Sequence, residues 1–377
     1  MVRNIIDPNH AMLLIDRIDS KYKAVWEDRS ISDQIALAQY FLPHSSRKPV
    51  IGPTRPRIVK WYCPFASQED FPTGHRYCVN VYAGCDHKCA YCYAAGYEPE
   101  NANTKKSFER HIGMDMDDLE RFDVPPAPVH LSNSTDPFQP LEKQFGHTRY
   151  ALEQILKHRH RFTTVTILTK NPMLPVQLGY IELFKAILDY RPDRSMYQDS
   201  RRHWPGFVIE VSLAFWQETA RIVCDQCAPT VKQRIEGIRA LHRAGIPLVL
   251  RIDPLFPRSP ITGNPVRNMA DFGLPEAQTI DDLEKLVFLA KEVEVKHIVY
   301  STAKIIQPRG RKLSQSMRTL RDVYESFAAP EKLIWRGGSW RLPFTIAEQR
   351  IVHPFLEICR SHGVKAKNCK QNLIETP

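Results

Sequence analysis

Three closely spaced cysteines, Cys85, Cys89 and Cys92, constrain this chain more than any other feature of its sequence. They form a C-x3-C-x2-C pattern directly after the apolar run Tyr77–Tyr82. Thiolates at this spacing can converge on one iron–sulfur cluster from a short loop. A four-iron cluster with three cysteine ligands keeps one iron open for a substrate or cofactor. Two alternatives stay open: a zinc knuckle with His87 as fourth ligand, although zinc sites usually add a distant second pair, and three unrelated cysteines.

The composition favours a cytoplasmic globular protein. The chain has 377 residues, 43% of them hydrophobic, and its apolar runs are all too short to span a membrane. Residues 1–8 lack the apolar core of a signal peptide. A cytoplasmic location fits nine cysteines that act as metal ligands or free thiols rather than as disulfides. The net charge of +10 and the pI of about 9.1 are compatible with nucleic-acid binding but do not require it.

From residue 76 onward, apolar β-branched runs alternate with helical patterns. This alternation predicts a parallel sheet of the α/β class, and its six units are too few for a complete eight-fold barrel. The expected strands are Tyr77–Tyr82, Val129–Leu131, Thr163–Leu168, Phe207–Leu213, Leu248–Ile252 and His297–Tyr300. Apolar positions spaced by three and four predict amphipathic helices over 231–241, 280–290 and 313–324.

Two extensions flank this core. Residues 1–75 are rich in proline and predict an irregular arm with one helix, Ser30–Leu42. Basic residues on the arm lie near Trp61 and Tyr62, which suits either a nucleic-acid strand or a solvated arm docked by its aromatic rings. Residues 328–377 contain a Gly-Gly turn between Trp335 and Trp340, then a helix, and are expected to close the barrel. The two tryptophans suit either base stacking or packing.

The motif Cys85-x3-Cys89-x-Tyr91-Cys92 resembles the signature of the radical S-adenosylmethionine (SAM) enzymes. The resemblance implies a partial (β/α)6 barrel of the TIM type over residues 76–327. It also implies a [4Fe-4S] cluster whose open iron binds SAM, and one-electron cleavage of SAM to a 5′-deoxyadenosyl radical that abstracts a hydrogen atom. A reductant such as flavodoxin or ferredoxin is the partner that it implies.

Later segments are similar to the spore photoproduct lyase branch of that family. They are Ser132–Pro140, Thr169-Lys170 and the helical stretch Ala228–Pro257. The branch implies that Lys170 contacts the SAM carboxylate, and that its amine or ribose is held by Ser212 together with Ser132, Thr135 or Asp136. It assigns Tyr91 and Tyr93 to radical chemistry or adenine contacts. The simpler interpretations are a strand-end lysine for Lys170, a packed hydroxyl for Ser212 and a turn residue for Asp136.

One position departs from the branch. The lyase has a cysteine after its second strand that returns a hydrogen atom to the substrate radical, and Asn133 is the nearest counterpart here. An asparagine cannot do that chemistry, so the resemblance supports the radical generator more than the lesion-repair substrate. Cys63 and Cys78 are interpreted as structural, with hydrogen donation as the alternative if either reaches the site.

Other side chains allow two interpretations each. Arg251 and Asp253 share one face of a strand and form either an ion pair or an anion site. Four cysteines allow a second metal site, either zinc or an auxiliary iron–sulfur cluster, and the alternative is free thiols. They are Cys224, Cys227, Cys359 and Cys369.

Three functions follow as hypotheses. The first is a radical SAM enzyme that modifies or repairs a nucleic acid or nucleotide. The second is a radical SAM enzyme that acts on a peptide or small metabolite, with a second metal site. The third is a non-enzymatic iron–sulfur or zinc protein that binds nucleic acid.

Overall fold

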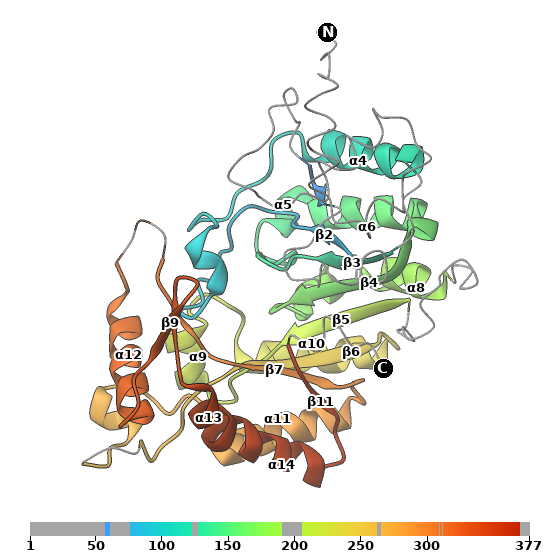
Figure 1. Ribbon diagram of the computed structural model, residues 1–377. Helices are drawn as coiled ribbons and strands as arrows, with labels where there is room; N and C mark the ends of the chain where they lie inside the picture. Colours follow the sequence, from blue (N-terminus) through green and yellow to red (C-terminus); the bar gives the residue numbers. More distant parts are fainter. Residues whose placement is uncertain are drawn as a thin grey trace, which may run out of the picture.

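One mainly parallel sheet organises the structure, a computed structural model that describes residues 57–60, 76–122, 127–190, 206–261, 265–308, 310 and 312–369. The expected helix Ser30–Leu42, the basic arm around Trp61 and Tyr62, and Cys63 lie outside the described residues. The strand order is β1-β2-β3-β4-β5-β6-β7-β11 (Figure 1). These strands are β1 (Val59–Lys60), β2 (Tyr77–Val79), β3 (Ala127–Leu131), β4 (Phe162–Thr169), β5 (Phe207–Ser212), β6 (Leu248–Leu255), β7 (Ile298–Thr302) and β11 (Ala366–Asn368).

All six expected strands are present as β2 to β7. They pair in parallel with their neighbours along the chain, whereas β1 is antiparallel to β2 and β11 is parallel to β7. The sheet does not close on itself, since β1 and β11 stand at its two edges. The predicted partial barrel of six β/α units is therefore confirmed.

Side chains alternate across this sheet and give it two different faces. The outer face carries apolar residues such as Val129, Ile167 and Ile209, which are completely buried in the main core. The inner face has a small apolar cluster formed by Val208, Val249 and Val299. On the same strands Glu210 is two residues after Val208, and Arg251 is two residues after Val249, so the inner face becomes polar toward the carboxyl ends of the strands.

Helices pack on the outer face between the strands. They are α4 (Phe108–Phe122), α5 (Glu142–Phe145), α6 (His147–Lys157), α7 (Met173–Gln177), α8 (Ile181–Asp189), α9 (Glu218–Cys224), α10 (Val231–Arg243), α11 (Ile280–Glu292) and α12 (Gln315–Ala328). The three expected amphipathic helices are α10, α11 and α12. Thr230 and Thr279 begin α10 and α11 with capping boxes, in which each threonine hydroxyl accepts a hydrogen bond from a backbone N–H of the first turn.

A second, three-stranded sheet has the order β8-β10-β9, with β8 (Ile305–Ile306), β9 (Ile334–Arg336) and β10 (Ser339–Arg341). The Gly337-Gly338 turn between β9 and β10 has positive φ at both residues, which suits a tight hairpin and favours glycine. Figure 1 shows this sheet and α12 at the left, beside the cyan turn η1 (Tyr93–Gly96). A methyl group of Ile306 in β8 lies 3.8 Å from where a Cβ would stand on Gly96 in η1.

The chain ends with α13 (Phe344–Ala347), the π-helical turn η5 (Glu348–Val352) and α14 (His353–Ser361), which together form the expected C-terminal helix. Ile351, Phe355 and Cys359 are buried along this helical segment. After α14 the chain returns to the large sheet as β11 and extends it at β7. Within the described ranges, no helix is both long enough and apolar enough to cross a membrane.

Candidate functional site

The three-cysteine loop follows β2 at the carboxyl edge of the parallel strands, where α/β folds place reactive groups. Gly84 precedes the first cysteine with a φ of +71°, and an added Cβ would collide with the carbonyl oxygen of Asn101. Cys85, Cys89 and Cys92 are all partly exposed. Burial raises the pKa of each thiol, that of Cys85 to about 12, and the charge of Cys92 further raises the pKa of Cys85 and Cys89. The three cysteines thus lie on one short loop at this edge of the sheet.

A segment between α9 and α10 holds this loop by its main chain. The Ala90 N–H donates to the carbonyl of Cys224 at 2.8 Å, and the Cys227 N–H donates to the carbonyl of His87 at 3.0 Å. Between these two bonds, Cys89 and Asp225 form an antiparallel bridge. The cluster loop is therefore positioned by a short strand-like contact with residues far away in the sequence.

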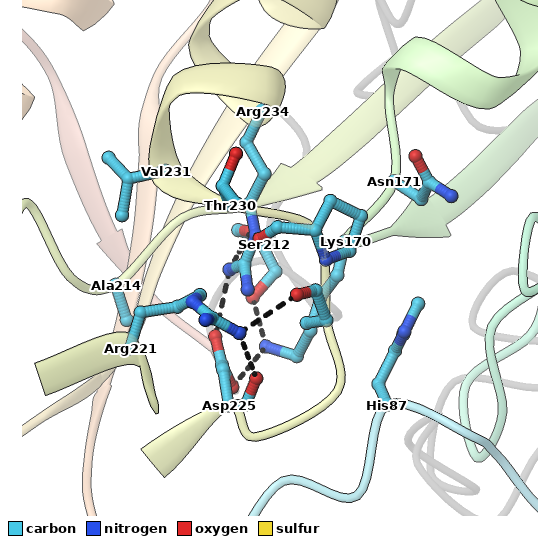
Figure 2. A network of polar contacts seen from close by, with 12 residues as sticks. His87, Lys170, Asn171, Ser212, Ala214, Arg221, Asp225, Thr230, Val231 and Arg234 are labelled. Carbon is cyan, nitrogen blue, oxygen red and sulfur yellow. Dashed lines mark hydrogen bonds and ion pairs between the residues drawn. The ribbon is translucent and has the colours of Figure 1, made fainter. Parts of the chain in front are cut away.

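Lys170, at the end of β4, connects three parts of the site. Its Nζ donates to the Ser212 hydroxyl and to the Tyr91 hydroxyl, both at 2.8 Å, and lies 3.5 Å from Asp225 Oδ1. Tyr91 in turn donates to Asp225 Oδ1 at 2.6 Å. The structure thus brings Lys170, Ser212 and Tyr91, all predicted from the sequence, into one hydrogen-bonded group. Figure 2 shows Lys170 and Ser212 of this group.

Asp225 is the anionic centre of this group. Its other oxygen accepts a hydrogen bond from Arg234 Nη1 at 2.8 Å, and both side chains are completely buried. Burial alone would raise the pKa of Asp225, but Lys170 and Arg234 outweigh it and hold that pKa well below its usual range. Burial would likewise lower the pKa of Lys170, whereas Asp225 reverses the effect and raises it. Lys170 is therefore a cation.

Asp136 has a different role from the predicted cofactor contact. Oδ1 accepts hydrogen bonds from Phe138 N and the Thr169 hydroxyl, both at 2.8 Å. Oδ2 accepts from Lys170 N at 2.6 Å and pairs with His87 Nε2 at 3.0 Å. A carboxylate has about four lone-pair sites, and these four bonds use them all. Asp136 therefore links the cluster loop to the ends of β3 and β4, and its carboxylate oxygens have no acceptor site left for a ligand.

Two other predicted residues keep their polar atoms available. Ser132 Oγ and Thr135 Oγ1 are buried without a hydrogen-bond partner, and Ser132 has a φ of +64°. Nδ1 of His87, in the cluster loop, is also buried without one. Buried polar atoms normally have partners, so unsatisfied hydroxyls in the loop after β3 fit a site completed by a polar ligand. The donor set therefore fits SAM at a cluster.

Tyr93 begins η1 and faces the loop after β3. Its hydroxyl donates to the carbonyl of Asn133, and the Asn133 amide donates to Cys78 Sγ at 3.2 Å. Tyr97 lies beside them and shares a hydrogen bond of 2.9 Å with Ser134. Asn133 thus contacts both Tyr93 of η1 and the Cys78 thiol.

Arg251 and Asp253 form an ion pair, which is the first of the two interpretations offered from the sequence. Arg251 also donates to Glu210 Oε2 at 2.6 Å and to Cys369 Sγ at 3.0 Å. Burial alone would raise the pKa of Glu210, but Arg251 and His130 lower it strongly. Two carboxylates surround one guanidinium, so the interior of the barrel here offers no unpaired positive charge for an anionic substrate.

The four cysteines predicted for a second metal site do not come together. Cys359 is buried in α14 in the outer core, whereas Cys369 packs on the inner face against Val208, Val249 and Val299. Among the described residues, no three Cys, His, Asp or Glu side chains are placed to share one metal ion. The sheet therefore separates two of the four cysteines expected at a second metal site, and that site stays a prediction. A four-iron cluster requires a different geometry, since each of its thiolates binds its own iron.

Asp225 and Arg234 were missed from the sequence. A signal was present for Arg234, because it lies among the buried positions Val231, Ile238 and Leu241 on one face of α10. A cationic residue at a core position of an amphipathic helix indicates a buried partner. For Asp225 the cysteines on either side drew attention to metal binding instead.

Comparison with known proteins shows which solved structures have a similar fold. No family model matches the chain. A spore photoproduct lyase variant superposes with a TM-score of 0.52 at 11% identity, covering 84% of this chain and 79% of the lyase. A second lyase variant, with a dinucleoside spore photoproduct, has a TM-score of 0.50 at 11% identity, covering 81% and 79%.

Two curated relatives match in sequence. An uncharacterized protein of Methanocaldococcus jannaschii is 25% identical over 186 residues, 49% of this chain and 62% of the relative. An uncharacterized protein of Mycobacterium tuberculosis is 27% identical over 193 residues, 48% of this chain and 50% of the relative. The match thus spans between half and two thirds of these relatives. At the level of the fold, the resemblance to spore photoproduct lyase expected from the segments after the cysteine motif is confirmed.

Proposed function

We propose that the chain is a radical SAM enzyme. The observation that carries the proposal is the placement of Cys85, Cys89 and Cys92 at the carboxyl edge of the sheet, within reach of Lys170. Three thiolates bind three irons of a [4Fe-4S] cluster, and the fourth iron stays open for SAM. The spore photoproduct lyase fold of the chain supports the same function.

The chain's own residues would prepare this site for SAM. When bound, the cluster and SAM supply a 5′-deoxyadenosyl radical. The Lys170 ammonium, which hydrogen-bonds to Tyr91 and Ser212, would neutralise the SAM carboxylate. The unsatisfied hydroxyls of Ser132 and Thr135 are available to the amine or the ribose.

Anaerobic reconstitution with iron and sulfide tests this function. We expect about four irons per chain, and 5′-deoxyadenosine on addition of SAM and dithionite. A variant with all three cysteines changed to alanine should show neither. A chain that binds the cluster but forms no 5′-deoxyadenosine would refute the enzyme and support a non-enzymatic iron–sulfur protein. Flavodoxin or ferredoxin as physiological reductant, and a cytoplasmic location, remain predictions.

A nucleic acid or nucleotide is the proposed substrate class. The observation that favours it is the β9–β10 hairpin near η1, in which Trp335 is 53% exposed and its ring lies 4.4 Å from that of Trp340. Arg336 and Arg341 flank the turn, and their like charges are close enough to contribute to a lowered pKa at Arg341, after burial. An exposed aromatic ring beside arginines suits stacking on a base. The dinucleoside in the similar lyase and the net charge of +10 agree with this choice.

Binding of a single-stranded oligonucleotide at several salt concentrations tests the substrate class. Affinity should fall steeply with salt, because phosphate contacts release counterions, and Trp335→Ala should weaken binding by roughly 1–3 kcal/mol if one base stacks on the ring. Salt-independent or absent binding would favour a peptide or metabolite instead. We do not extend the proposal to cleavage of a dimer lesion, because Asn133 stands where the lyase has its hydrogen-donating cysteine.

A further inference from the structure

Asp225 contacts side chains from three different elements of the site. Tyr91 comes from the cluster loop, Lys170 from the end of β4 and Arg234 from α10, and all three side chains meet this one carboxylate. Figure 2 shows Lys170 and Arg234 approaching Asp225 from different ribbons. A carboxylate with one phenol and two cations as partners is fixed in position, and it fixes them in turn.

The backbone around Asp225 is held as firmly as its side chain. Arg221 Nη1 donates to the carbonyls of Asp225, Gln226 and Ala228 at 3.3, 3.0 and 3.0 Å. The same segment bridges to Cys89. Since main chain and side chain are both anchored, a change in charge at Asp225 need not displace the cluster loop. The effect of the Asp225 charge can therefore be measured separately from the position of the cluster loop.

We propose that Asp225 and Arg234 form a buried charge pair that sets the reduction potential at the three-cysteine loop, while Asp225 positions Lys170 and Tyr91. This inference rests on the proposed function. In a water-poor interior, charges act over distance with little screening, and the surroundings of a cluster tune its potential. The negative charge of Asp225 opposes the arrival of an electron, and the positive charge of Arg234 favours it.

Removing the charge of Asp225 and removing the charge of Arg234 should shift the reduction potential in opposite directions. Asp225→Asn should raise the potential of the reconstituted cluster, and Arg234→Gln should lower it. We expect each to change the reduction equilibrium roughly tenfold, which is about 59 mV for one electron. The double variant should return close to the wild-type potential. The measurement is a redox titration of the full-length protein without SAM, followed by the electron paramagnetic resonance signal of the reduced cluster.

A matched control separates charge from burial. Asp115 is also a completely buried carboxylate, but it lies on α4 and contacts Arg57 and the backbone of β1. Asp115→Asn should therefore leave the potential unchanged. Arg234→Lys keeps the positive charge and should restore most of the shift caused by Arg234→Gln, which keeps the test open even if Asp225→Asn fails to fold.

The outcomes distinguish this inference from the function on which it rests. Shifts of Asp225→Asn and Arg234→Gln in the same direction would show a loss of structure rather than a loss of charge, and would overturn it. So would unchanged potentials, or equal shifts for Lys and Gln at position 234. If the wild-type protein assembles a cluster and cleaves SAM under these outcomes, the inference alone fails. A wild-type chain that binds no cluster would overturn both.

Discussion

Loss of the Arg234 side chain should destabilise the protein more than loss of any exposed arginine. Arg234→Ala leaves the Asp225 charge buried after removing its partner at 2.8 Å, and both side chains are completely buried. Breaking such a pair typically costs about 3–5 kcal/mol. Lys170 at 3.5 Å and the Tyr91 hydroxyl at 2.6 Å still compensate the carboxylate. We therefore expect a loss of unfolding free energy at the lower end of this range, about 3 kcal/mol, which changes the unfolding equilibrium constant by a little over a hundredfold.

Urea unfolding of the cluster-free protein, followed by circular dichroism, measures this loss. The control is Arg239→Ala, which breaks a pair with Glu292 at a similar distance of 2.7 Å but at the surface, where an ion pair contributes about 0–1 kcal/mol. The combined variant Asp225→Asn, Arg234→Met should recover much of the loss, because no unpaired charge stays buried. A loss for Arg234→Ala no larger than that for Arg239→Ala would refute the buried-pair reasoning.

Three further predictions concern the loop, the cofactor and the pH dependence. Gly84→Ala should lower the iron content and the stability, because the added Cβ collides with the carbonyl of Asn101. The control Gly146→Ala also has positive φ but open space around it, and should retain the iron. Equal iron content in both variants would contradict this reasoning. Lys170→Ala should keep the cluster but weaken SAM binding about tenfold or more, measured by the change that SAM causes in the cluster's resonance signal, and unchanged affinity would remove Lys170 from the cofactor site. Burial opposes ionisation of Glu120, but hydrogen bonds from a neighbouring arginine and two histidines lower its pKa from 4.5 to about 2. Its stabilising effect is therefore complete above pH 4.5 and lost as the pH falls toward 2, so the difference in unfolding midpoint between wild type and Glu120→Gln should shrink over that range; a constant difference would argue against it.

The core of the fold was predictable because its strands are continuous apolar runs. Strands buried on both faces, such as Phe207–Ser212, which is buried at all six positions and apolar at four of them, cannot be exposed without a large loss. The small sheet around Trp340 was not predicted. Its strands have only two or three residues each, and Ile334 is exposed. Such strands form through contacts distant in sequence rather than through a local apolar pattern.

The site was predictable in its members but less so in their roles. Cys85, Lys170 and Ser212 were identified from the motif and from strand ends, where parallel sheets gather side chains. The role of Asp136 could not be read from the sequence, because its four hydrogen bonds come from residues up to 49 positions away. The separation of Cys359 from Cys369 could not be predicted either. The path of the whole C-terminal segment decides on which side of the sheet each cysteine lies.

The two edges of the large sheet also protect the protein from self-association. An open sheet exposes unpaired N–H and C=O groups at its first and last strands, and such edges are templates for a strand of another molecule. Here β1 has two residues and β11 has three, and each includes a lysine. Edges so short and charged offer few backbone groups to a neighbour. An open barrel can therefore keep its interior accessible from one side without inviting the intermolecular strand pairing that leads to aggregation.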